Sequence, residues 1–323
     1  MSTTPASTTP AQAAAVPAAT PAPAAATPAP AAAAPAAPRL DFALLAVAIA
    51  SVSLSAPLIA ATAAPALAIA FWRNAMAVGA LTPLAAVRYR AQLRGLTRRE
   101  VGLAVAAGAL LALHFGLWLP SLRMTSVASS TALCTTTPIW TTIALRLRGH
   151  RPPAMVWAGT LVACAGVVML TGIDMTTSPR ALAGDALALG GGVAAAGYVL
   201  LGAEVRRTVD TVPYTYLCYG TAAAGLLGAC LASGADLTSY SGVTWVKLAA
   251  LTVAAQLLGH SLLNRVVRGL GASVTSTAIL LETPGAALIA ALWLGQQPPA
   301  LAWPALVVIL GGLALVVRAS RSA

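Results

Sequence analysis

From Asp41 onward, the chain alternates between long apolar runs and short polar connections. Each run has about twenty residues, which as an α-helix spans the roughly 30 Å hydrocarbon core of a bilayer. The pattern predicts ten membrane spans, at residues 42–62, 65–87, 101–121, 124–145, 154–172, 184–204, 213–232, 243–263, 270–294 and 300–318. We therefore expect an all-α polytopic membrane protein.

The stretch from His114 to Trp157 is repeated, without a gap, from His260 to Trp303. At a constant offset of 146 positions, the repeat pairs histidine with histidine, Thr-Pro with Thr-Pro, glycine with glycine and tryptophan with tryptophan. The pairs are His114 and His260, Thr137-Pro138 and Thr283-Pro284, Gly149 and Gly295, and Trp157 and Trp303. The chain is therefore predicted to consist of two related halves, residues 41–172 and 182–318.

Each half contains five predicted spans. Because five is an odd number, the second half enters the membrane from the opposite side, which gives an inverted repeat. The loops agree with this reading, since RLRGHRPP follows the fourth span and WLGQQPP follows the ninth. The glycine and the proline pair are kept in both loops while the arginines are lost. We expect ten helices arranged as two inverted five-helix repeats.

Composition places the chain in the membrane class. Hydrophobic residues make up 59% of it, charged residues only 8%, and the mean hydropathy is +0.83. The net charge of +11 raises the possibility of a nucleic-acid partner, but most basic residues lie in short connections beside apolar runs. Such residues report topology. The lipid bilayer is therefore the expected partner, and a nucleic acid is not.

Basic residues are distributed unequally between the two sides. Fifteen arginines fall on one side, from Arg39 to Arg321, whereas the opposite loops hold only Arg123 and Arg180. Loops rich in arginine stay in the cytoplasm, so both termini are predicted to be cytoplasmic and the protein to lie in the cytoplasmic membrane. The four cysteines all fall inside predicted spans, so we expect no disulfide framework, metal site or cofactor.

Residues 1–38 consist almost entirely of Ala, Pro, Thr and Ser. A segment without charged or aromatic residues in its first 38 positions cannot bury a core, so we expect a disordered cytoplasmic tail. The segment has no basic start followed by an apolar stretch, so it does not have the pattern of a secretory signal peptide.

Glu282 places a carboxyl group about twelve residues, or roughly 18 Å, into the ninth span. A charge at the bilayer centre costs at least about 2.5–3.5 kcal/mol, so the side chain must face protein or a water-filled cavity. The first half has Thr136 at the equivalent position. We expect Glu282 either to bind protons or substrate, or to be a permanently protonated acid that hydrogen-bonds a neighbouring helix.

Pro138 and Pro284 interrupt the fourth and ninth spans near mid-membrane. Each removes a backbone donor, and a broken backbone at that depth is tolerated only where protein or a cavity satisfies it. This is the usual setting of a transporter site. The hydroxyl groups of Thr136 and its neighbours can serve either the freed carbonyl groups or a ligand.

His114 and His260 are equivalent positions of the two repeats. We expect them to flank a central cavity, one on each side of the midplane, either as a proton relay or gate or as structural hydrogen bonders. Gln256 and Asn264 lie four residues before and after His260, so the three side chains are predicted to share one inward face of the eighth span.

Arg73 lies inside the second span, beside Trp72 and Asn74. It can bind an anionic group of a substrate, or it can extend to the outer headgroups as an interfacial arginine. Trp118 and Trp140, in the third and fourth spans, are candidates to line a pocket for an organic solute.

The chain resembles the EamA type of the drug/metabolite transporter superfamily in its ten spans and its five-plus-five repeat. It also resembles that type in the motifs TSVASSTAL and TTTPIW of the first half and GASVTSTAILLETP of the second. The resemblance covers residues 41–318. It implies export of amino acids, metabolites or drugs through a cavity lined by spans 1–4 and 6–9. Glu282 with Pro284, and Arg73, match the family's carboxylate, proline and arginine.

These patterns favour a secondary transporter that exports a small organic solute by alternating access, with proton coupling as a candidate driving force. The chain has no Walker A motif for ATP use, and neither an HExxH nor a GxSxG motif that would indicate an intramembrane enzyme. A receptor or scaffold that transports nothing is the alternative that the sequence leaves open.

Overall fold

The computed structural model describes residues 1–2, 4, 38–125, 127–171, 178–295 and 302–321. It divides into two units, Met1–Ala34 and Pro35–Ala323, and the second unit contains every helix described below. Apart from residues 1, 2, 4 and 38, the segment predicted to be a disordered tail lies outside the described residues.

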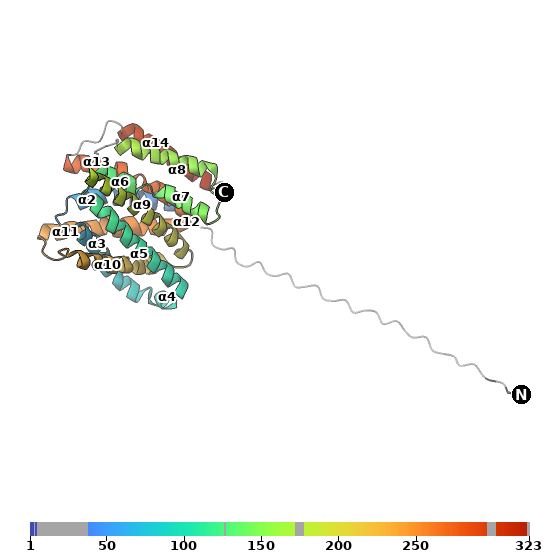
Figure 1. The fold of residues 1–323 in the computed structure, drawn as a ribbon. Helices are drawn as coiled ribbons and strands as arrows, with labels where there is room; N and C mark the ends of the chain where they lie inside the picture. The colour runs from blue at the N-terminus through green and yellow to red at the C-terminus, as the bar shows by residue number, and fades with distance from the viewer. Residues whose placement is uncertain (3, 5–37, 126, 172–177, 296–301, 322–323) are drawn as a thin grey trace. The chain divides into compact units, whose positions relative to one another are not determined.

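The second unit is built of helices, and the described residues contain no β-strand (Figure 1). The helices are α1 (Pro38–Ser53), α2 (Ser55–Ala60), α3 (Ala66–Val87), α4 (Arg90–Gly95), α5 (Arg98–Ser121), α6 (Val127–Cys134), α7 (Thr137–Leu147), α8 (Ala154–Thr171), α9 (Pro179–Val205), α10 (Thr211–Ser233), α11 (Gly242–Leu251), the π-helix η1 (Thr252–His260), α12 (Ser261–Ile279), α13 (Glu282–Leu294) and α14 (Ala302–Arg321).

The helices account for the ten predicted spans. Six helical stretches in the described chain are long and apolar enough by themselves to cross a membrane: Arg39–Ala60, α3, α5, α9, α10 and Gly242–Ile279. Helices α8 and α14 supply two shorter apolar spans. The fourth span is divided into α6 and α7, and the ninth continues from α12 into α13. The short helix α4 lies in the connection between the second and third spans.

The boundary between the eighth and ninth spans is Gly271, inside α12. Its backbone is non-helical, with φ 76° and ψ 166°. His260 and Glu282 lie 11 residues before and after this glycine, and on one straight helix they would be about 33 Å apart. Both nevertheless line one small cavity. The chain therefore reverses direction at Gly271, which makes eighth and ninth spans out of one apolar stretch.

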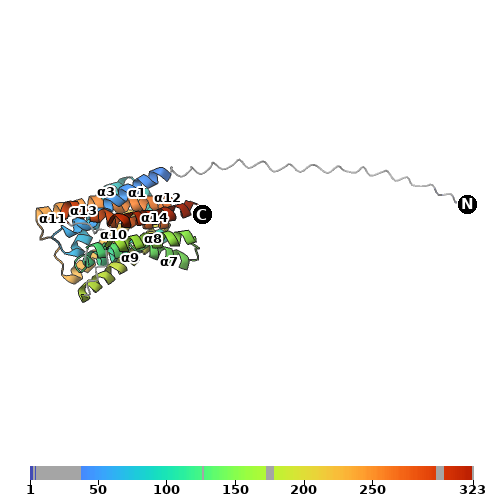
Figure 2. The same ribbon diagram turned by 90° about the horizontal axis from the view of Figure 1, so that it is seen from above.

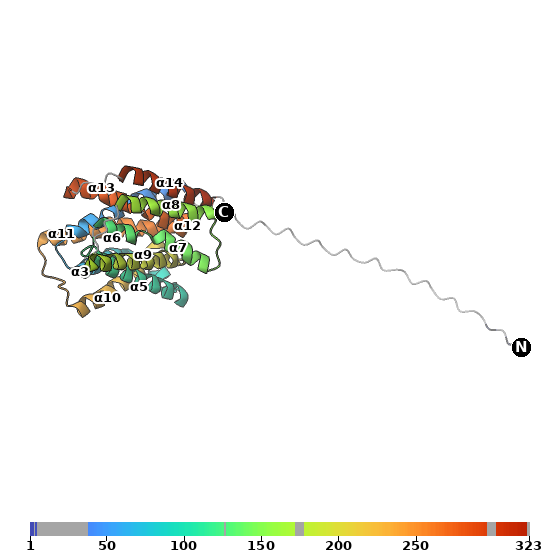
Figure 3. The ribbon, with the colours of Figure 1, turned by 45° about the horizontal axis from the view of Figure 1, so that its top comes forward.

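Packing between the helices repeats in the two halves. Helix α5 packs along α9 (Figure 1). The equivalent η1 and α12 pack along α1, and Figure 2 shows α12 beside α1. The remaining equivalent helices meet each other directly, since α3 packs on α10 and α8 on α14 (Figures 1 and 3). These contacts are what a two-fold pseudo-symmetric pair of five-helix repeats requires.

Polar contacts join different helices at each of the two ends of the bundle. At the arginine-rich end, Arg99 Nη2 lies 2.9 Å from Glu204 Oε1 and Arg265 Nη1 lies 3.4 Å from Asp41 Oδ1. These contacts join the start of α5 to the end of α9, and α12 to the start of α1. At the opposite end, a hydrogen bond from Lys247 Nζ to the Ala61 carbonyl, at 2.6 Å, joins α11 to the loop after α2.

Local sequence signals explain several helix ends. Thr97 and Glu100 form a capping box at the start of α5, which satisfies amide groups that the first helical turn leaves without partners. Gly149 and Gly295, equivalent in the repeat, both have a left-handed backbone, with φ 87° and 68°. Glycine adopts that conformation without steric cost, which explains why both loops contain it.

Candidate functional site

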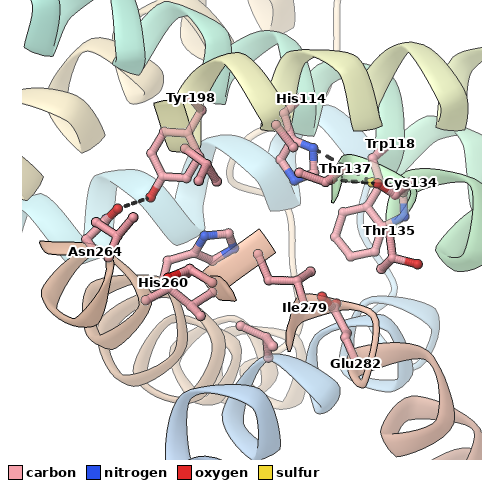
Figure 4. A pocket seen from close by; sticks show the side chains of 16 residues that line it. His114, Trp118, Cys134, Thr135, Thr137, Tyr198, His260, Asn264, Ile279 and Glu282 are labelled. Carbon is pink, nitrogen blue, oxygen red and sulfur yellow. Dashed lines mark hydrogen bonds between the residues drawn. The ribbon is translucent and has the colours of Figure 1, made fainter. Parts of the chain in front are cut away.

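Both halves of the protein contribute to one cavity of about 50 Å³, which has room for a few water molecules. Its wall comes from α1, α5, α6, α7, α9, η1, α12 and α13 (Figure 4). The lining residues are Val52, His114, Trp118, Cys134, Thr135, Thr137, Ala195, Tyr198, Val199, His260, Leu263, Asn264, Val267, Thr275, Ile279 and Glu282.

The position of the cavity along the spans follows from the turn at Gly271. His260 and Glu282 lie 11 residues on either side of it, which corresponds to about 16 Å of helix. Half of a 30 Å hydrocarbon core is about 15 Å. The cavity is therefore at mid-membrane depth, between the two halves of the repeat.

Glu282 is the first residue of α13 and follows the break at Leu280 and Leu281. Its carboxyl group lines the cavity. Within the described parts of the chain, no hydrogen bond or ion pair to this carboxyl group is present. A carboxyl group in a cavity without a fixed partner is available to a proton or to a solute.

The helix breaks lie just before the two prolines. Helix α6 ends at Cys134 and α7 begins at Thr137, one residue before Pro138. The hydroxyl of Thr137 donates to the Cys134 carbonyl at 3.1 Å, and Pro138 cannot donate to that carbonyl. The hydroxyl oxygens of Thr135 and Thr283 share a hydrogen bond at 3.1 Å, which joins the two broken spans.

Thr136 and Trp140 are occupied by local contacts. The Thr136 hydroxyl donates to the Leu133 carbonyl at 2.6 Å, and Trp140 Nε1 donates to the Thr136 oxygen at 3.2 Å. Neither residue lines the cavity in this structure. Thr136, the equivalent of Glu282, thus serves its own helix, while the threonines on either side of it reach the cavity.

His114 and His260 both line the cavity, from α5 and from the end of η1. His114 Nδ1 donates to the Gly191 carbonyl at 3.0 Å, because a carbonyl can only accept. Nε2 of neutral His114 is consequently an acceptor. The His114 ring stacks on Trp118 with centroids 5.7 Å apart, and the His260 ring meets Phe115 edge-on at 5.4 Å.

Arg73 is fully buried and is not among the residues that line the cavity. Its Nε donates to Gln256 Oε1 at 2.9 Å, and its guanidinium covers the Phe115 ring at 4.2 Å. Gln256 in turn donates to Asn74 at 2.9 Å. Arg73 therefore does not extend to the outer surface, and Gln256 holds Arg73, whereas His260 and Asn264 line the cavity.

Tyr198 of α9 is a lining residue that the sequence patterns did not single out. Its hydroxyl donates to Asn264 Oδ1 at 2.8 Å (Figure 4). The Nδ2 atom of Asn264 and Nε1 of Trp118 are buried and have no hydrogen-bond partner in the part of the chain that the structure describes. The signal that could have revealed Tyr198 is its setting, since it is an aromatic residue in a segment otherwise made of glycine, alanine and valine.

The chain was compared with known proteins. It matches the EamA-like transporter family over residues 40–172 and again over residues 182–318. No curated protein sequence matches significantly. Among solved structures, one titled "Crystal structure of protein" is 16% identical, covers 88% of this chain and 98% of its own, and has a TM-score of 0.67, which shows a shared fold. Because the family match covers both halves, the chain belongs to the EamA-like transporter family.

Proposed function

We propose that this protein is a secondary active transporter that exports a small organic solute by alternating access, coupled to proton movement at Glu282. The observation that carries the proposal is the Glu282 carboxyl group, which lies in a mid-membrane cavity between two inverted repeats and has no hydrogen bond or ion pair to the described residues. Transporters of this design bind substrate and coupling ion at the interface between repeats, near broken helices.

The size of the cavity supports a mechanism with more than one conformation. A volume of about 50 Å³ admits water but not an organic solute the size of an amino acid, so binding requires the walls to move apart. Both halves contain points at which the backbone can bend: the helix break before Pro138 in the first half, and the break before Pro284 and the turn at Gly271 in the second. Rocking of one half against the other opens the cavity to alternate sides.

Proton coupling follows if the Glu282 carboxyl group binds either a proton or the solute, but not both. Loading the solute then releases the proton, and the proton gradient returns the empty carrier to its starting state. His114 and His260 line the same cavity, which supports a role for them in passing protons between Glu282 and the two sides of the membrane.

The arginine-rich end of the bundle is assigned to the cytoplasm by the excess of basic residues there. Both termini are then cytoplasmic and the chain is a multi-pass protein of the cytoplasmic membrane. Export means that the solute enters from this end.

Inside-out membrane vesicles acidified by respiration test the function. Addition of a transported solute lets protons leave the vesicle, which a pH-sensitive dye reports as recovery of fluorescence. We expect a subset of a panel of amino acids, amines and drugs to cause recovery in vesicles that contain the protein and none in vesicles without it. If no solute in a broad panel moves protons, the coupled-export proposal is wrong.

A further inference from the structure

The cavity has a negative group but no fixed positive one. Among the described residues that line it, Glu282 carries a carboxyl group and none is lysine or arginine. Arg73 is buried outside this lining. It donates to Gln256 and Ser55, its guanidinium lies over the Phe115 ring, and its charge acts on Glu282 without an ion-pair contact between the two side chains in the described structure. Among the lining residues, a solute anion would therefore meet only a like charge, whereas a solute cation would find a carboxylate as its counter-ion.

The remaining polar atoms of the wall divide into acceptors and donors. Glu282 and Nε2 of neutral His114 accept hydrogen bonds. His260 Nδ1, which donates or accepts according to its tautomer, is buried without a hydrogen-bond partner among the described residues. Trp118 Nε1 and Asn264 Nδ2 are donors that likewise have no partner there, on side chains that are 3% and 4% exposed. A buried donor without a partner is costly, so both are suited to an acceptor on a bound molecule. Figure 4 shows Asn264 and Glu282 at opposite ends of the site, with His260 between them.

The rest of the wall is apolar and aromatic. Val199, Leu263, Val267 and Ile279 supply aliphatic surface, and the stacked His114 and Trp118 rings supply a flat aromatic face. Apolar surface in a pocket binds the hydrocarbon part of an organic molecule. An ammonium group is attracted to an aromatic face as well as to a carboxylate.

We propose that the solute is an organic monocation: an apolar body with a protonated amine that pairs with Glu282 and an oxygen acceptor that meets Asn264 or Trp118. This inference rests on the proposed export function and names its substrate class. One proton leaves Glu282 when the ammonium group binds, so the charge of the site is the same in its protonated and its loaded state. The titratable groups that share the cavity lining with Glu282 are His114, Cys134, Tyr198 and His260. The fully buried Arg73 is a further charged group that acts on Glu282 from outside the lining.

Thermal unfolding of the purified full-length protein tests this class without any transport. Four probes share one carbon skeleton: leucinol as the cation, leucine as the zwitterion, 4-methylpentanol as the neutral form and 4-methylpentanoate as the anion. We expect leucinol to raise Tm by a few degrees near saturation, and the neutral alcohol and the anion to leave Tm unchanged. Because the proton competes for the same carboxyl group, acidification weakens leucinol binding by up to about tenfold per pH unit.

Glu282→Gln is expected to abolish the leucinol shift, and Glu282→Asp to retain a smaller one. Glu204→Gln is the matched control, because Glu204 pairs with Arg99 at the end of α9, away from the cavity, and the shift is expected to persist. The monocation assignment is overturned if 4-methylpentanoate or the alcohol raises Tm as much as leucinol does. It is also overturned if the rise in Tm with leucinol survives Glu282→Gln, or if no probe changes Tm. Leucinol binding without coupled transport overturns the export function alone.

Discussion

Gly271→Ala is expected to destabilise the protein by about 1–3 kcal/mol. The glycine has φ 76° and ψ 166°, a region that is essentially restricted to glycine and that costs another residue an amount of this order. A Cβ atom at this position would meet no heavy atom within 4 Å. The whole cost is therefore backbone strain at the turn that reverses the chain between the eighth and ninth spans, without a contribution from a clash.

The measurement is thermal or denaturant unfolding of the purified protein, compared with Gly220→Ala. Gly220 lies inside α10 and also has open space around an added Cβ atom, so alanine there removes the conformational penalty of a helical glycine and stabilises by about 0.5–1 kcal/mol. The two substitutions make the same chemical change and are expected to act in opposite directions. If Gly271→Ala is as stable as the unsubstituted protein, the chain does not turn at Gly271 as described.

Two further predictions concern packing and topology. Gly312→Ala is expected to cost about 1–3 kcal/mol of unfolding free energy, because an added Cβ atom would lie 2.5 Å from the backbone of α8, at Gly159. Gly311 lies in the same helix and faces open space, so Gly311→Ala is expected to stabilise by about 0.5–1 kcal/mol, like Gly220→Ala. Equal losses for the two substitutions would contradict the α8–α14 contact. A cysteine introduced at the exposed Ala91 is expected to react with a membrane-impermeant thiol reagent only from the cytoplasmic side. A cysteine at the exposed Ser239 is expected to react only from outside. The reverse labelling would contradict the predicted orientation.

The architecture was predictable because it depends on patterns that survive in a single sequence. Span length, loop arginines and the repeat at a constant offset together indicate ten helices in two inverted halves. Helix ends were less predictable. The sixth span was expected at residues 184–204, but α9 begins at Pro179, because the Ser178 side chain accepts a hydrogen bond from the Ala181 amide and caps an extra turn. Such a cap carries no hydropathy signal.

A polar residue in an apolar run is a signal that a single sequence can show. Four residues chosen for this reason, Glu282, His114, His260 and Asn264, line one cavity, and their roles in binding or coupling stay predictions. Position along a helix could not show which polar groups already have partners. Gln256 and Arg73 bind each other, and the π-helical backbone from Thr252 to His260 alters the faces expected for a regular α-helix.

The central claim, that Glu282 couples proton movement to solute transport, is tested most directly in proteoliposomes energised by a pH gradient alone. The solute found in the vesicle screen is offered to the unsubstituted protein, to Glu282→Gln and to the Glu204→Gln control. We predict that Glu282→Gln is produced and inserted normally but loses all accumulation driven by the gradient, while the control keeps it. Accumulation against a solute gradient by Glu282→Gln, driven by the pH difference, would contradict the account.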